Sequence, residues 1–278
     1  MKDKKYKIVI FTDLKESLES SLKSTLSLIK IFNSEISIFH VKKALDVVKI
    51  ESQLSAMRSL NGEYIDMEKQ IKSIVETYSK KYDVPLSYSC AIGNVKNEIG
   101  KYIASEKPDI LVLGKRKSKV LNVFGDRLTK FILKKHKGPV MFTDSTNVLE
   151  LNSNLSLGII NDSEESSITD FAASLATHSQ KPIKSFKIAS DKKPSLNSKE
   201  KVGIKEIEFV FDQNDHTLKT ISNYISISKV NLLCINRDDI YSNSKNKSLS
   251  LITSVTDIIN NLNVPLILTA QHTLKGNS

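Results

Sequence analysis

The stretch PDILVLG, residues 108 to 114, decides the fold of this chain. Its apolar run from Ile110 to Leu113 has no alternation of polar and apolar residues, which is typical of a strand buried on both faces of a parallel sheet. Four further strand-like runs lie in the first half of the chain: KIVIFT at 7–12, EISIFHV at 35–41, LSYSCAI at 86–92 and GPVMFT at 138–143. Helical patterns separate these runs, so the sequence predicts a doubly wound α/β domain with a five-stranded parallel sheet.

The helices of this first half are indicated by apolar residues at helical spacing. Leu18, Leu22 and Leu26 share one face of the segment that follows the first strand. Residues 49–82 carry a longer apolar stripe, which predicts a long helix that Asn61 and Gly62 could interrupt. Asn94 is predicted to cap the helix after the third strand.

The second half of the chain repeats the plan of the first. Segments 155–176, 218–236 and 251–269 match first-half segments in the same order, which indicates a tandem duplication. We therefore predict two domains, 1–147 and 151–273, joined by a polar linker around 144–154.

The second domain is predicted to be a shorter, degenerate copy of the first. Where the first has its long helix, the second has DKKPSLNSKEKVG at 191–203, which predicts a loop. We expect the apolar face left without that helix to be covered by the first domain or by a second chain.

Composition bounds the class of protein. The 41 basic and 31 acidic residues give a formal charge of +10, but the lysines are spread among acids, which favours a solvated basic surface over nucleic-acid binding. No apolar stretch approaches the length of a membrane span, so a cytoplasmic protein without membrane contact is expected. The histidines lack metal-ligand spacing, and Cys90 and Cys234 are expected to be buried free thiols in strands.

Three segments carry a resemblance to a known family: IVIFTDLKESLESS, PDILVLGKRK and FGDRLTKFILKKHKGPVMF. In this order, on this fold, they resemble the universal stress protein family in its tandem two-domain form. The resemblance implies that Asp13 and Val41 would hold adenosine. It also implies that Gly114 would open a phosphate loop of the pattern Gly-x2-Gly-x9-Gly-[Ser/Thr].

The chain departs from that pattern after its first glycine. Lys117 stands where the second glycine is expected, and Arg127 and Leu128 stand where Gly and Ser/Thr are expected. The nearest glycine, Gly125, comes two residues early. A lysine at the second position adds bulk and disfavours the positive φ angle that lets a backbone approach a phosphate.

Charged residues on this loop have opposing effects. Asp126 is predicted to cap a helix that begins at Arg127, and its carboxylate would compete with a phosphate for the same N–H groups. The cations at 115–117 could instead attract an anion. In the second half Asn236 occupies the place of Gly114, and no glycine occurs from 204 to 275, so no phosphate site is expected there.

Three functions remain open from the sequence. The first is a non-enzymatic stress or regulatory module that acts through contacts with an unidentified protein. The second is an ATP-binding switch in which only the N-terminal domain is competent, and the third is a basic polyanion-binding protein. The chain lacks a Walker loop and a Gly-x-Ser-x-Gly elbow, so we expect no enzyme. We also expect no cofactor, with ATP in the N-terminal domain as the alternative.

The family resemblance implies that the last strand of each domain forms a pairing edge, as an exposed sheet edge tends to do. These strands are PVMFT at 139–143 and PLILT at 265–269. The two domains could pair inside one chain as a pseudo-dimer, or two chains could pair as a homodimer.

Overall fold

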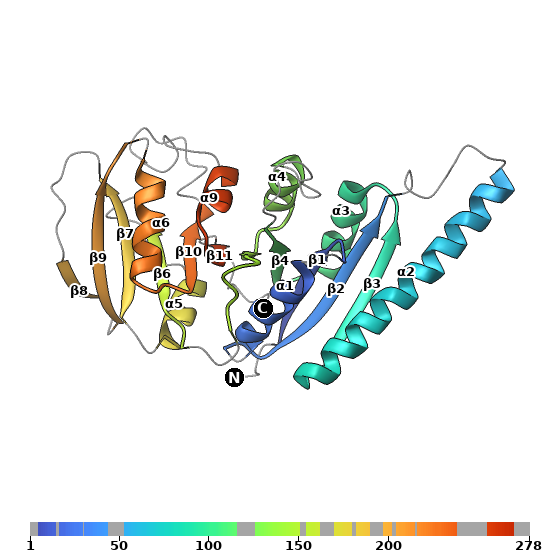
Figure 1. The fold of residues 1–278 in the computed structure, drawn as a ribbon, viewed down its shortest axis with the longest axis horizontal. Coiled ribbons are helices and arrows are strands. Elements are labelled where there is room, and N and C mark those ends of the chain that lie inside the picture. The colour runs from blue at the N-terminus through green and yellow to red at the C-terminus, as the bar shows by residue number, and fades with distance from the viewer. Residues whose placement is uncertain are drawn as a thin grey trace, which may run out of the picture.

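The computed structural model of the chain describes residues 5–14, 17–29, 31–43, 53–115, 126–150, 154–161, 170–179, 182–189, 197–201, 204–214, 216–237 and 255–269. Over these residues the chain forms one continuous eleven-stranded sheet (Figure 1). The strand order is β3-β2-β1-β4-β5-β11-β10-β6-β7-β9-β8.

The first half alternates strands and helices as predicted. Its elements are β1 (Tyr6–Thr12), α1 (Ser17–Ile29), β2 (Ser34–Lys42), α2 (Gln53–Tyr82), β3 (Leu86–Ile92), α3 (Val95–Glu106), β4 (Ile110–Gly114), α4 (Asp126–Lys135) and β5 (Val140–Thr143). All of these strands pair in parallel, and β4 lies between β1 and β5. Its residues from Ile110 to Leu113 are at most 2% exposed, in agreement with a central strand.

The second half repeats this strand order, with one addition. Its elements are β6 (Leu157–Asn161), α5 (Asp170–Thr177), β7 (Ile183–Ala189), β8 (Asn197–Lys201), β9 (Ile204–Asp212), α6 (Thr217–Ile227), β10 (Leu232–Asn236), α9 (Val255–Asn261) and β11 (Leu266–Thr269). Strand β8 pairs antiparallel with β9 at the edge of the sheet. The prediction of a loop over 191–203 was therefore wrong for 197–201, whose polar sequence gives no strand signal.

The two halves join through their last strands. β5 and β11 pair antiparallel, with Phe142 opposite Leu266 and Met141 opposite Ile267. The apolar cores on the two faces of the sheet each contain residues of both halves. Of the two alternatives left open, this arrangement fits a pseudo-dimer within one chain.

Helix α2 runs unbroken from Gln53 to Tyr82, so the expected interruption at Asn61 and Gly62 was wrong. Met67, Ile71 and Val75 on this helix are at most 5% exposed. Burial of that stripe outweighs one glycine, which costs a helix only about 1 kcal/mol. The predicted cap of α3 is confirmed, because Oδ1 of Asn94 accepts from the backbone N–H of Asn97 at 3.1 Å.

The face of the second half that lacks a counterpart of α2 is not apolar. Ser185, Lys187 and Glu208 lie on the side of the sheet to which Ile183 contributes its apolar contact. Nζ of Lys187 lies 2.9 Å from Oε2 of Glu208, and Ser185 is fully buried. Polar side chains thus stand where an apolar surface was expected, and the burial of Ser185 and Glu208 means that this part of the face is covered.

The linker is folded where the structure describes it. Oδ1 of Asp144 accepts from the backbone N–H groups of Thr146 and Asn147 at 2.7 and 3.0 Å, forming a side-chain turn. Leu149 is 2% exposed, and its carbonyl accepts from Oγ of Ser27 at 2.9 Å. A segment predicted to be only a polar connection therefore packs against α1.

Candidate functional site

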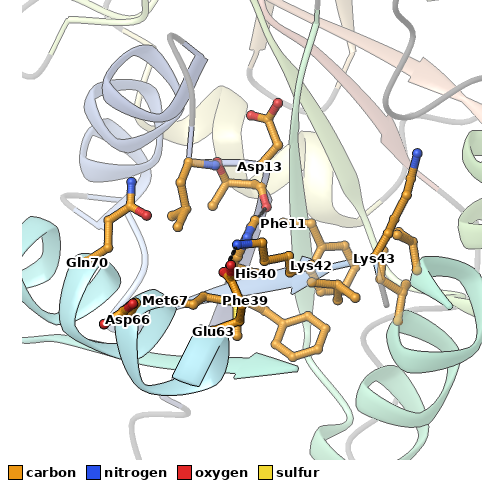
Figure 2. A pocket seen from close by; sticks show the side chains of 15 residues that line it. Phe11, Asp13, Phe39, His40, Lys42, Lys43, Glu63, Asp66, Met67 and Gln70 are labelled. Atoms are coloured by element: carbon orange, nitrogen blue, oxygen red, sulfur yellow. Dashed lines mark hydrogen bonds and ion pairs between the residues drawn. The ribbon is translucent and has the colours of Figure 1, made fainter. Parts of the chain in front are cut away.

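A cavity of about 500 Å³ lies in the first half, where β1 and β2 end (Figure 2). Ligands of open α/β sheets bind outside the carboxyl ends of the strands, and cavities of about 300–1,000 Å³ accommodate small molecules. The lining includes Asp13 and Val41, the two residues that the family resemblance assigned to adenosine. Because Thr12 pairs with His40 across β1 and β2, residues 13 and 41 fall at the same level of the sheet.

His40 lies on the wall of this cavity and is 9% exposed. Its Nδ1 is 2.9 Å from the carbonyl oxygen of Thr12, and since a carbonyl only accepts, Nδ1 carries the proton. Burial lowers the pKa of His40, and the positive charge of Lys42 lowers it further. The imidazole is therefore neutral at pH 7 and holds the ends of the two strands together.

Helix α2 supplies a polar wall that sequence analysis missed. Glu63, Asp66 and Gln70 line the cavity from this helix, and Figure 2 shows Asp66 and Gln70 on the side opposite Lys43. Glu63 forms an ion pair with Lys42 at the end of β2. The spacing of 63, 66 and 70 around the buried Met67 was the available signal, since these positions share one helical face.

Gly114 does not line the cavity, and the structure gives a different reason for a glycine there. A Cβ at Gly114 would lie 2.7 Å from Cβ of Ser17 and 2.8 Å from its Oγ. The missing side chain thus lets the start of α1 pack directly against the end of β4. A phosphate-binding role for Gly114 remains a prediction.

Lys115 does not extend into the cavity as a free cation. Its Nζ donates to the carbonyl oxygens of Leu262 and Val264 at 2.7 and 2.8 Å, across the junction between the halves. Burial lowers the pKa of Lys115 to about 8, against the opposing effect of the Asp144 carboxylate, so the amine is still mostly protonated at pH 7. Its predicted attraction for an anion is offset by these two contacts.

The other predicted loop residues lie largely outside the part of the chain that the structure describes. This holds for Lys117, Gly125 and the side chain of Asp126. Helix α4 begins at Asp126, one residue earlier than predicted. The proposed capping by its carboxylate therefore remains a prediction. In the second half, Asn236 occupies the end of β10 as expected and is 7% exposed.

The residues that the structure describes contain neither a metal cluster nor a membrane-spanning helix. No group of three or more His, Cys, Asp and Glu side chains there could hold a metal ion. No helix in those ranges is both long enough and apolar enough to cross a membrane. Cys90 and Cys234 are both free thiols as expected; Cys234 is buried, but Cys90 is only half-buried, so the expectation of burial was wrong for Cys90.

Known structures resemble the whole chain. A universal stress protein from Archaeoglobus fulgidus superimposes with a TM-score of 0.67 at 16% identity, covering 95% of this chain and 96% of that one. The chain has the tandem universal stress protein fold. A putative universal stress protein from Pseudomonas aeruginosa gives a TM-score of 0.55 at 10% identity, over 96% of this chain and 94% of its own. Neither the comparison with family models nor that with curated proteins gives a match.

Within the universal stress protein fold, the two halves of this chain are not equivalent. The described cavity belongs to the first half, where Asp13 and Val41 meet. The loop after β4 begins with a lysine that contacts the second half instead of the cavity.

Proposed function

We propose that this chain is a universal stress protein whose first half binds an adenine nucleoside or a nucleotide with few phosphates. We further propose that it acts in the cytoplasm as a regulator through protein contacts, without catalysing a reaction. One observation carries the proposal: the cavity of about 500 Å³ at the ends of β1 and β2 brings Asp13 and Val41 together.

The preference for few phosphates follows from the loop after β4. A triphosphate needs bare N–H groups or free cations near the base of the cavity. Lys115 already donates to two carbonyls, and Gly114 packs against Ser17. The glycine expected at position 117 is a lysine. A ligand whose affinity comes from its base and ribose fits these residues better than ATP does.

The proposal of a non-catalytic role rests on how His40 and Lys42, two of the ionisable residues that line the cavity, are used. Nδ1 of His40 holds the backbone of Thr12, and Lys42 is paired with Glu63. A general base must reach a substrate proton while keeping a pKa suited to the transfer, and both requirements conflict with these structural contacts.

Titration calorimetry of the full chain with adenosine, AMP and ATP tests the binding. We expect saturable binding of adenosine or AMP, with ATP binding no more tightly. Asp13→Asn should weaken that binding about tenfold or more, because it removes a charged acceptor from the cavity. Asp83→Asn is the matched control, since Asp83 lies outside the cavity lining and asparagine tolerates its φ of 51°.

Two results would refute the proposal. One is the absence of binding by all three compounds. The other is ATP binding much more tightly than AMP, which would indicate a working phosphate cradle. Release of phosphate from ATP at a rate that Asp13→Asn abolishes would refute the non-catalytic part alone.

A further inference from the structure

Two cations hold the halves of the molecule together from equivalent positions. Lys115 is the first residue after β4, and Arg237 is the first residue after β10, which is the counterpart of β4. Each side chain crosses to the other half of the chain. Neither contact is part of the cavity described above.

Lys115 binds the turn between α9 and β11. Its Nζ donates to the carbonyls of Leu262 and Val264, and Nδ2 of Asn147 donates to the carbonyl of Asn263 between them. Three successive carbonyls of the second half thus accept from side chains of the first half or the linker. The carbonyls at the end of a helix lack intrahelical partners and carry a partial negative charge, so a cation is favoured there.

Arg237 binds the corresponding turn of the first half. Its guanidinium donates to the carbonyls of Leu133 at 3.2 Å and His136 at 2.7 Å, and also to the carbonyl of Gly138. Arg237 is only 5% exposed. A guanidinium with several fixed donors suits this set of three acceptors.

The two sets of acceptors are equivalent by position. Leu262 and His136 each follow directly after the last residue of a helix, α9 and α4 respectively. Val264 and Gly138 each lie two residues before the first residue of a last strand. The contacts therefore repeat about the pseudo-twofold relation between the halves, although the donors are a lysine and an arginine.

We propose that Lys115 and Arg237 form a reciprocal pair of interhalf clasps, in which the first residue after β4 and the first residue after β10 lock the two halves into one unit. Each cation neutralises the carbonyl end of a helix in the other half. The inference does not depend on the ligand of the cavity.

Coupled unfolding of the halves tests the clasps. Urea unfolds the full chain and its Lys115→Met, Arg237→Met and double variants. Hydrogen exchange measured by mass spectrometry then gives, for each half separately, the urea concentration at the midpoint of unfolding. We expect one shared midpoint in the unaltered chain. Each single variant should lower it, and in the double variant the midpoints of the two halves should separate.

Two kinds of control accompany these variants: one removes a positive charge elsewhere on the surface, and the other keeps the charge at the clasp. Lys72→Met and Arg58→Met lie on the exposed side of α2 and should leave the shared midpoint unchanged. The exchanges Lys115→Arg and Arg237→Lys keep the charge and should retain most of the coupling. If a methionine variant does not fold, Lys115→Gln or Arg237→Gln, which also lacks the positive charge, takes its place in the same test.

Two outcomes would overturn the proposal that Lys115 and Arg237 couple the two halves. The first is a double variant whose halves still share one midpoint, displaced no further than in the controls. The second is a Lys115→Met variant that keeps full coupling but loses calorimetric binding of AMP or inorganic phosphate. That result would make Lys115 a ligand-binding residue.

Discussion

His136 is a buried histidine beside a buried arginine. It is 5% exposed, and burial together with the charge of Arg237 lowers its pKa to about 4. The unfolded chain binds a proton there near pH 6.5, so between pH 6.5 and 4 the unfolded state holds more protons than the folded state. Stability must therefore fall as the pH is lowered through this window.

The size of this effect can be measured at two pH values. Between pH 7 and pH 5, His136 alone should remove about 2 kcal/mol from the free energy of unfolding. His40, whose pKa is also lowered, adds to the loss. Urea unfolding at both pH values should show a shallower pH dependence for His136→Gln than for the exposed-site control His178→Gln. An equal pH dependence of the free energy of unfolding in both variants would contradict the lowered pKa of His136.

Gly138 is required by close packing next to the same histidine. A Cβ there would lie 2.3 Å from the carbonyl oxygen of Asp109 and 2.6 Å from Nε2 of His136. The first of these neighbours is backbone and cannot move cheaply. Gly138→Ala should therefore lower the free energy of unfolding by about 2 kcal/mol or more in urea titrations. A loss below about 0.5 kcal/mol would show that the turn relaxes easily.

Helix α2 contains a glycine, Gly62, whose replacement by alanine is expected to raise stability instead of lowering it. Nothing lies within 4 Å of a Cβ added at Gly62, which sits in an unbroken helix. Gly62→Ala should raise the free energy of unfolding by about 0.5–1 kcal/mol, because alanine loses less backbone entropy. The thermal midpoint of this variant should rise, and a fall would indicate that α2 is interrupted at this position after all.

Strands β7 and β9 carry an ion pair between Lys187 and Glu208, on the face of the sheet that corresponds to the one α2 covers in the first half. Glu208 has a side chain only 9% exposed, and Lys187 lies within 2.9 Å of it. Lys187→Met would leave a buried carboxylate without this partner and should cost about 2 kcal/mol. Replacing both, as Lys187→Met with Glu208→Leu, should recover most of that loss in a double-mutant cycle. Additive losses would mean that the two side chains do not interact.

Elements with a hydrophobic period could be predicted, whereas those held by other forces could not. The apolar run from Ile110 to Leu113 predicted the central strand β4, and the internal repeat predicted the strands of the second half, because buried strands require apolar residues in order. Strand β8 was missed because Asn197–Lys201 is polar and depends on pairing with β9 alone. The continuity of α2 was missed because tertiary burial outweighed a local helix breaker.

The candidate site shows the same division. The family resemblance assigned Asp13 and Val41 to one site, and the parallel pairing of β1 with β2 brings the ends of these strands to one edge of the sheet. The hydrogen-bond partners of Lys115 could not be predicted. They are backbone carbonyls about 150 positions away in the chain, and backbone carbonyls have no sequence signature. Only the repeated position of a cation after β4 and β10 offered a signal.

At the scale of the whole molecule, the internal pairing of β5 with β11 removes the edges through which two chains would otherwise join. The outer strands of the sheet are then β3 and β8. Strand β8 carries Lys199, Glu200 and Lys201, and charged residues on an edge strand oppose pairing with another chain. Helix α2 packs along β3 at the other edge.

This arrangement predicts a monomer in solution. Light scattering at increasing protein concentration should give a constant mass near the 31.1 kDa of one chain. Met141→Asp tests the cause, because it places a carboxylate at a fully buried position opposite Ile267 and should open the junction between the halves. We expect that variant to show a larger hydrodynamic radius or a mass that rises with concentration, as the freed last strands pair between chains. A dimeric mass for the unaltered chain would show instead that an outer strand or helix face still serves as an interface, and that internal pairing does not satisfy the sheet.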